Sequence, residues 1–135
     1  MGNDGATVGI VLVSHSGKLA EGLHELIAQL GSAGGRVFSA GGTDDGGIGT
    51  SYERIGAAIA EADSGAGVVV LADIGSAVLT ARTVLEDESR DDLVLVDAPF
   101  VEGAVAAAVT ASTGAALAAV TEAARDARSQ PKFPD

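Results

Sequence analysis

Residues 8–18 read VGIVLVSHSGK, and this stretch decides the fold. It opens as a continuous apolar run that ends at Val13 and then turns polar. Such a run predicts a strand buried on both faces, as in the centre of a parallel sheet. Ser16 and Gly17 are where a helix could be capped and begin. His15 is therefore expected at the carboxyl end of a first strand and just before a helix, where open α/β sheets bind their ligands.

Composition narrows the class of protein. With 135 residues the chain can bury one core, and the absence of cysteine excludes disulfides and thiolate metal sites. Two histidines cannot build a multi-histidine metal site, so no metal is predicted. A formal net charge of −11 argues against nucleic acid as a partner. No apolar stretch has the length of a membrane span and the start, MGNDGATV, lacks a signal-peptide pattern, so a cytoplasmic protein is expected.

Strands and helices are predicted to alternate along the chain. Strands are expected at 8–13, 36–40, 67–72 and 93–96, and helices at 17–30, 51–63, from the DIGSA turn (73–77) to residue 85, at 101–112 and at 115–127. Gly31 is expected to stop the first helix, and 34–35 to form a turn. The connections have the length of βαβ crossovers. The pattern therefore predicts an α/β fold with a doubly wound, four-stranded parallel sheet and helices on both faces.

Two helices are assigned apolar faces from their sequence. In the first helix the apolar face comprises Leu19, Leu23, Leu26, Ile27 and Leu30. In the second, Tyr52, Ile55 and Ile59 are expected to point inward. The charged segment 86–92 is interpreted as a solvated connection after the third helix.

The carboxyl ends of the strands should bring His15, the 41–51 loop, Asp73 and Asp97 to one edge of the sheet. An imidazole there could be a nucleophile or a general base. Asp73 could accept a hydrogen bond from His15 and fix its tautomer, or could cap the following helix. Ser76 has the same two interpretations. The second histidine, His24, lies at the border of an apolar helix face and is expected on the surface.

The glycine-dense loop GGTDDGGIGTS (41–51) could hold a phosphate through its backbone N–H groups. It is not a Walker A loop, because no Gly-Lys-Ser/Thr follows it, and it does not follow the first strand as a dinucleotide fingerprint does. Asp44 and Asp45 suggest a metal, but a solvated acidic turn is the favoured interpretation.

Four motifs together resemble a known family. VSHSGKLAEG (13–22), GGTDDGGIGTS (41–51), DIGSA (73–77) and DAPFVEGA (97–104) resemble the phosphotransferase subunit of the dihydroxyacetone kinase complex, the DhaM family. The core of that family is similar to mannose-class enzyme IIA domains of the sugar phosphotransferase system. The resemblance covers about residues 7–127, so a single domain is expected over 1–135, with 128–135 as a flexible tail.

The resemblance implies a fold and an activity. Members have sheet order 2-1-3-4, form homodimers, and accept a phosphoryl group from the phosphocarrier protein HPr on a histidine, here His15. The group then passes to ADP on the nucleotide-binding kinase subunit, and the resulting ATP phosphorylates dihydroxyacetone on a second kinase subunit. No cofactor is implied in this subunit, because ADP, ATP and Mg²⁺ belong to the partner. Around His15 the resemblance implies roles for Asp73 in orienting the ring and for Ser16, Gly42, Thr43 and Ser76 in positioning the phosphate.

Some members continue into HPr-like and enzyme I-like domains, and this chain is expected to need a separate HPr. Phe100 stands in DAPFVEGA where an aliphatic residue is expected, a conservative departure. Two alternatives remain open: a mannose-class enzyme IIA that serves sugar transport, and a regulatory module that only binds partners.

Overall fold

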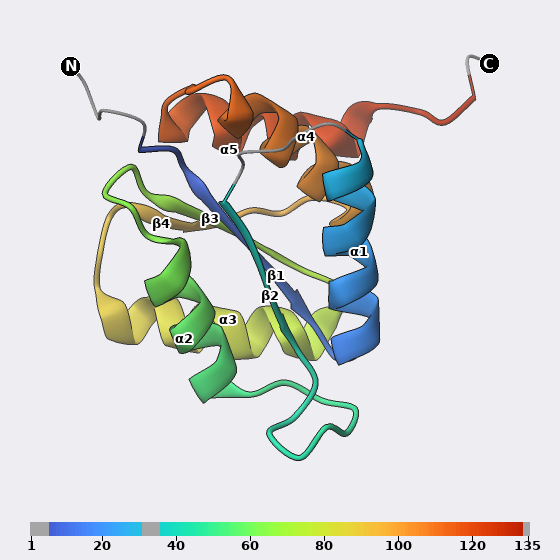
Figure 1. Ribbon diagram of the computed structural model, residues 1–135, viewed down its shortest axis with the longest axis vertical. Coiled ribbons are helices and arrows are strands. Elements are labelled where there is room, and N and C mark those ends of the chain that lie inside the picture. The colour runs from blue at the N-terminus through green and yellow to red at the C-terminus, as the bar shows by residue number, and fades with distance from the viewer. Residues whose placement is uncertain (1–5, 31–35, 134–135) are drawn as a thin grey trace.

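The computed structural model describes residues 6–30 and 36–133 (Figure 1). Its strands are β1 (Gly9–Ser14), β2 (Arg36–Gly41), β3 (Val68–Ala72) and β4 (Leu93–Leu95). Its helices are α1 (Gly17–Gln29), α2 (Tyr52–Ala62), α3 (Gly75–Glu88), α4 (Phe100–Ser112) and α5 (Leu117–Asp126), with a 3₁₀ turn at Ala127–Ser129. The predicted stop at Gly31 and the predicted turn at 34–35 lie outside the described residues.

The four strands form one parallel sheet in the order β2-β1-β3-β4, which confirms the predicted fold and strand order. Helices α1, α4 and α5 cover one face, and α2 and α3 cover the other. The helices have 10 to 14 residues, and among the residues described none is long and apolar enough to cross a membrane.

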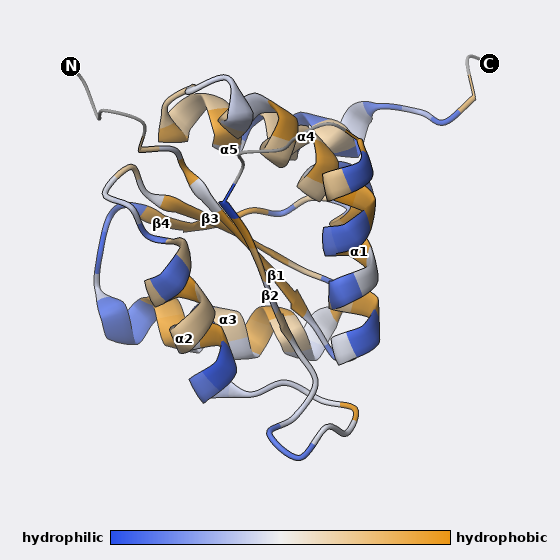
Figure 2. Ribbon diagram, in the orientation of Figure 1, coloured by the Kyte–Doolittle hydropathy of each residue, from blue (hydrophilic) through white to orange (hydrophobic). Residues whose placement is uncertain are grey.

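Strand β1 is apolar as far as Val13 because it has a helical layer on each side. Ile10 and Leu12 pack into the core beneath α1, α4 and α5, whereas Val11 and Val13 pack into the core above α2 and α3. All four side chains are fully buried. Figure 2 shows β1 and β3 as mainly hydrophobic ribbons, whereas α1 alternates between hydrophobic and hydrophilic residues. The layered packing therefore holds the end of β1, and His15 beyond it, on a rigid support.

The buried face of α1 is narrower than its periodicity predicts. Leu23 and Ile27 are buried with Ala20, but Leu19, Leu26 and Leu30 are 42 to 54% exposed. These leucines share the apolar face without being buried, because periodicity shows which side of a helix is apolar and not how much of that side a neighbour covers. Here α1 lies across the β1 and β2 side of the sheet, and its outer leucines extend past it.

Two further differences concern α2 and α3. Tyr52 begins α2, is 40% exposed instead of buried, and its hydroxyl donates to Asp87 at 2.6 Å. The charged segment after residue 85 is not a connection at first, because α3 continues to Glu88. Glu is a good helix former on an exposed face, so the charges extend the helix until Ser89 adopts a left-handed conformation, φ 53°, and ends it.

Gly9 provides a test of how closely the layers approach. A Cβ built there would lie 2.7 Å from Ala62 Cβ and 2.9 Å from its carbonyl carbon, so backbone would have to move. We expect Gly9→Ala to lower the free energy of unfolding by about 3 kcal/mol, at the upper end of overpacking costs. Gly22→Ala is the control: nothing lies within 4 Å, and the change should raise the free energy of unfolding by about 0.5–1 kcal/mol. Urea unfolding of both variants measures this, and equal stabilities would contradict it.

Candidate active site

His15 follows the last residue of β1 and precedes α1, as predicted. Ser16 caps α1, since its hydroxyl oxygen accepts from the Leu19 amide at 3.2 Å. The glycine loop, residues 41–51, is fastened to the same point. The Gly42 amide donates to the Ser14 carbonyl at 3.1 Å, and the Gly49 amide donates to the His15 carbonyl at 2.8 Å. The backbone of His15 is thus held by a strand, a helix start and a loop.

Asp73 lies at the end of the neighbouring strand β3 and contacts His15 twice. Its Oδ1 lies 2.9 Å from His15 Nδ1, and its Oδ2 accepts from the His15 amide at 3.0 Å. Oδ2 also accepts from the Ser14 hydroxyl at 2.8 Å, and Oδ1 from the Ile74 amide at 2.7 Å. The predicted contact is present, and the helix-cap interpretation fails because Ile74, not Asp73, occupies the cap position of α3.

These hydrogen bonds keep Asp73 ionised. Burial alone raises the pKa of the Asp73 carboxyl, but the hydrogen bonds from His15 and the neighbouring donors outweigh burial and hold the pKa below its ordinary value of 3.8. An ionised carboxylate only accepts hydrogen bonds, so Nδ1 of a neutral His15 ring must carry the proton. Nε2 then has the free lone pair. The site therefore presents a nucleophilic nitrogen on the side of the ring away from Asp73.

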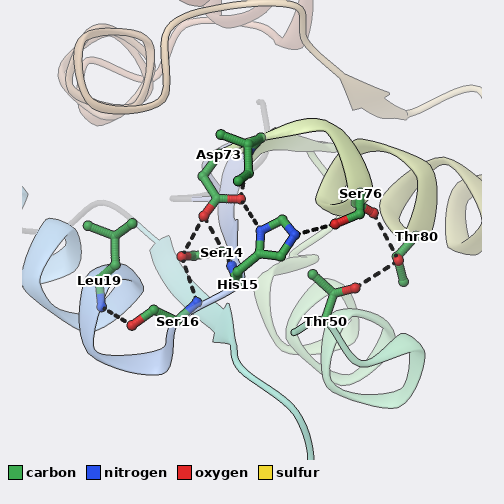
Figure 3. A network of polar contacts seen from close by, with 9 residues as sticks. Ser14, His15, Ser16, Leu19, Thr50, Asp73, Ser76 and Thr80 are labelled. Carbon is green, nitrogen blue, oxygen red and sulfur yellow. Dashed lines mark hydrogen bonds and ion pairs between the residues drawn. The ribbon is translucent and has the colours of Figure 1, made fainter. Parts of the chain in front are cut away.

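Nε2 faces the hydroxyl of Ser76, which lies in the first turn of α3 and contacts it directly (Figure 3). A hydroxyl can donate to the Nε2 lone pair, so Ser76 is placed as a partner of the nucleophilic atom. The same close-up shows a hydroxyl chain running from the carbonyl of Ser76 to Thr80 and on to Thr50 in the glycine loop.

The remaining predicted site residues have local contacts. The Thr43 hydroxyl donates to Asp45 Oδ1 and accepts from the Gly47 amide at 2.9 Å, which folds the loop tip. Gly42 is buried, with φ 76°, a left-handed conformation that only glycine adopts freely. Thr43 and Gly42 therefore shape the loop. Among the contacts found in the described residues, neither of them contacts the imidazole of His15.

Other candidates lie apart from the ring. Asp97 pairs with Arg128 at 3.0 Å and is 88% exposed. Asp44 accepts from the Ser51 hydroxyl at 2.6 Å and pairs with Arg54, so the acidic turn is internally occupied. No group of three or more histidine or acidic side chains within 6–30 and 36–133 is arranged to hold a metal ion. His24 is exposed, as predicted.

Sequence reasoning did not assign roles to Ser14, Thr50 or Thr80. Ser14 is a fully buried polar residue at the end of an apolar strand, and its hydroxyl links Asp73 to the Ser16 amide, at 2.8 and 3.0 Å. A polar side chain inside a buried run is a signal that could have identified it. Thr50 and Thr80 carry no such signal, because their contact depends on the rotation of α3.

Two hollows are lined by neighbours of His15. One of about 470 Å³ lies on the α1 side, lined by Ser16, Lys18 and the glycine loop. Another of about 380 Å³ lies on the β4 side, lined by Asp73, Arg82 and Asp97. The His15 side chain itself is 18% exposed, so part of it is open to solvent.

The lowered pKa of Asp73 predicts a pH dependence of stability. Because the folded pKa lies below the unfolded one, Asp73 stabilises the fold fully above the ordinary value of 3.8, and this contribution disappears as the pH falls through the folded pKa. We expect the stability difference between wild type and Asp73→Asn to shrink between about pH 5 and pH 2. Urea unfolding across that range measures it. A difference that stays constant or grows toward acid pH would contradict the assignment.

Known proteins are similar to this chain in sequence and in fold. The family model described as the PTS system fructose IIA component, EIIA-man, matches residues 9–121. A Listeria innocua protein named PEP-dependent dihydroxyacetone kinase 2, phosphoryl donor subunit DhaM, is 43% identical over 105 residues, covering 76% of this chain and 84% of that protein. An Escherichia coli protein with the corresponding DhaM name is 41% identical over 114 residues, covering 80% of this chain and 24% of that protein.

Among solved structures, a crystal structure of a protein of unknown function, EF1359, superposes with a TM-score of 0.77 at 38% identity, covering 89% of this chain and 94% of that one. The resemblance inferred from the four motifs is thereby confirmed. Because the family model matches residues 9–121, most of the chain, the chain belongs to the EIIA-man family, the PTS system fructose IIA component.

Proposed function

We propose that this chain is the phosphocarrier subunit of a dihydroxyacetone kinase and carries the phosphoryl group on Nε2 of His15. It accepts the group from HPr and passes it to ADP bound, with Mg²⁺, on the nucleotide-binding kinase subunit. The relatives named phosphoryl donor subunits of PEP-dependent dihydroxyacetone kinase support the kinase as the acceptor. The chain itself needs no cofactor for this reaction, and we expect it to work as a homodimer in the cytoplasm.

One observation carries the proposal: Asp73 Oδ1 holds His15 Nδ1 at 2.9 Å. With the proton fixed on Nδ1, the lone pair of Nε2 attacks the phosphorus of the donor, a P–N bond forms, and the bond from phosphorus to the donor breaks. The imidazole gains positive charge in this step, and the neighbouring carboxylate stabilises it. In the return step an oxygen of the ADP β-phosphate attacks, and the P–N bond breaks.

The start of α3 also supports Nε2 of His15 as the atom that carries the phosphoryl group. The amides of Gly75 and Ser76 precede the first backbone bond of the helix, which the Ala77 amide makes to Ile74. Free amides and the helix dipole favour an anion at a helix N-terminus. The Ser76 hydroxyl contacts Nε2 and can donate to an oxygen of the phosphoryl group.

The surroundings of His15 suit a protein partner. Ile48, beside the Gly49 anchor, is 78% exposed, and Ile74, beside Asp73, is 65% exposed. Leu79, one turn beyond Ser76, is 64% exposed. Exposed large apolar side chains near a site are typical of an interaction surface. Donor and acceptor proteins can therefore dock over the ring without a lid.

The test is phosphorylation from a defined relay. The purified chain is incubated with phosphoenolpyruvate, enzyme I and HPr, and the product is mapped by mass spectrometry under neutral conditions. We expect one acid-labile phosphoryl group on His15, discharged when the two kinase subunits, ADP, Mg²⁺ and dihydroxyacetone are added, with dihydroxyacetone phosphate formed.

Each alternative gives a different result. No label on the wild-type chain would overturn the phosphocarrier proposal and favour a binding module. A label that the kinase subunits leave in place, but that a mannose-class enzyme IIB domain removes, would favour the transport enzyme IIA. Labelling on a residue other than His15 would overturn the assigned site.

A further inference from the structure

A pair of threonines links the glycine loop to α3 beside His15 (Figure 3). Thr50 Oγ1 lies 2.8 Å from Thr80 Oγ1, and Thr80 Oγ1 donates to the Ser76 carbonyl at 3.1 Å. A threonine hydroxyl has one proton, so Thr80 spends its proton on Ser76 and Thr50 must be the donor to Thr80. Both side chains are half-buried, where a hydrogen bond is partly shielded from water.

These contacts form a closed network of hydrogen bonds around the imidazole of His15. Thr50 directly follows Gly49, whose amide donates to the His15 carbonyl at 2.8 Å. On the other side the Ser76 hydroxyl contacts Nε2 of His15. The network therefore joins the end of β1, the end of the glycine loop and the first turn of α3, segments that are distant in the sequence.

Phosphorylation of His15 would change one contact of this network. A phosphorus bonded to Nε2 occupies the space into which the Ser76 hydroxyl now reaches, so the direct contact between His15 and Ser76 is replaced by contacts to phosphate oxygens. The contacts of Asp73 to His15 remain, and they hold the chain just before α3. Among the side-chain hydrogen bonds found in the described residues, the threonine pair is then the one that joins the glycine loop to the body of α3.

We propose, on the basis of the proposed function, that Thr50 and Thr80 are positioning residues. They hold Ser76 and the start of α3 in place relative to His15 while the imidazole carries the phosphoryl group. Neither touches the reacting atoms. They act through the Ser76 carbonyl and the Gly49 anchor, and so fix the distance between the imidazole and the donors at the start of α3. Errors of about 1 Å in such a distance cost up to about 100-fold in rate.

Helix α3 contains a matched control. Thr83 makes the same type of bond within the helix, from its hydroxyl to the Leu79 carbonyl at 3.0 Å. It is exposed, and no contact from Thr83 to the glycine loop is found in the described part of the chain. Thr83→Val therefore removes a local helix bond of equal kind, whereas Thr80→Val also removes the link to the loop.

The experiment compares Thr50→Val, Thr80→Val, the double variant, Thr80→Ser and Thr83→Val in the relay from phosphoenolpyruvate through HPr. We expect Thr50→Val and Thr80→Val to slow discharge to the kinase subunits about 10-fold, the double variant to be no slower than the slower single one, and Thr80→Ser to keep the wild-type rate. Thr83→Val should also match wild type. Thermal unfolding of each variant shows that slow transfer is not a loss of fold.

Hydrogen exchange at the Gly49 amide tests the pair in the unphosphorylated chain. Thr50→Val and Thr80→Val should raise the exchange rate about 10-fold, and Thr83→Val should leave it unchanged. The wild-type chain must first be shown to accept the phosphoryl group. If Thr50→Val and Thr80→Val then have the same transfer and exchange rates as Thr83→Val, the proposed positioning role of the threonine pair is overturned. An unlabelled wild-type chain would instead overturn the proposed function, and the exchange rates would still decide whether the pair holds the loop.

Discussion

His15→Gln is expected to abolish phosphorylation of the chain altogether. Glutamine can fill the space of the ring and can hydrogen bond to Asp73, but its amide nitrogen is not a nucleophile and forms no phosphoramidate in this relay. The fold should survive, because His15 is not a member of either hydrophobic core cluster. Phosphorylation by HPr, followed by mass spectrometry at neutral pH, measures the result directly.

The other histidine is the matched control. His24 is exposed on α1, and His24→Gln should accept the phosphoryl group at the wild-type rate. Undiminished label in His15→Gln, or a label lost in His24→Gln alone, would show that the carrier is not His15. Equal melting temperatures for the two variants would exclude unfolding as the reason for lost label.

The second large effect is expected for Asp73→Asn, which should slow phosphorylation of His15 by about 1,000-fold or more. The amide oxygen can still accept from the His15 amide and the Ser14 hydroxyl, which orients the NH₂ group toward Nδ1 at the cost of the hydrogen bond from the Ile74 amide. Nδ1 must then be the acceptor, the ring proton moves to Nε2, and the lone pair needed for attack is lost. The variant reverses the tautomer with little change of shape.

Initial rates of phosphorylation with excess HPr measure this effect, and Asp97→Asn supplies the control. Asp97 follows the neighbouring strand β4 and pairs only with Arg128 among the contacts found in the described residues, so its variant should transfer at the wild-type rate. A rate for Asp73→Asn within 10-fold of wild type would mean that the carboxylate does not set the tautomer. A ¹⁵N NMR spectrum of the imidazole gives the tautomer independently.

The fold and the centre of the site could be predicted because both follow from short-range patterns. An apolar run such as that of β1 is stable only between two helical layers, and the carboxyl ends of parallel strands must lie on one edge. The meeting of His15 and Asp73 follows from those two facts. The family resemblance then identified the chemistry that this pair could perform.

The features that could not be predicted depend on how a helix is rotated and on how much of it is covered. Leu19 and Leu26 lie on the apolar side of α1, but sequence periodicity does not tell how far the sheet reaches beneath them. The contact between Thr50 and Thr80 requires a particular rotation of α3 against the loop. Single threonines are common on helix surfaces, so neither residue stands out until the elements are assembled.

The two anchors of the glycine loop have a consequence for how such carriers can diverge. Gly42 and Gly49 tie the loop to the strand end through backbone atoms alone, so the tether does not depend on which side chains lie between them. Residues 44–48 are exposed, and under the proposed function they would border the surface on which a partner docks. Exposed positions of this tip such as Ile48 could then change, and with them the choice of partner, while the two backbone anchors keep the imidazole in place.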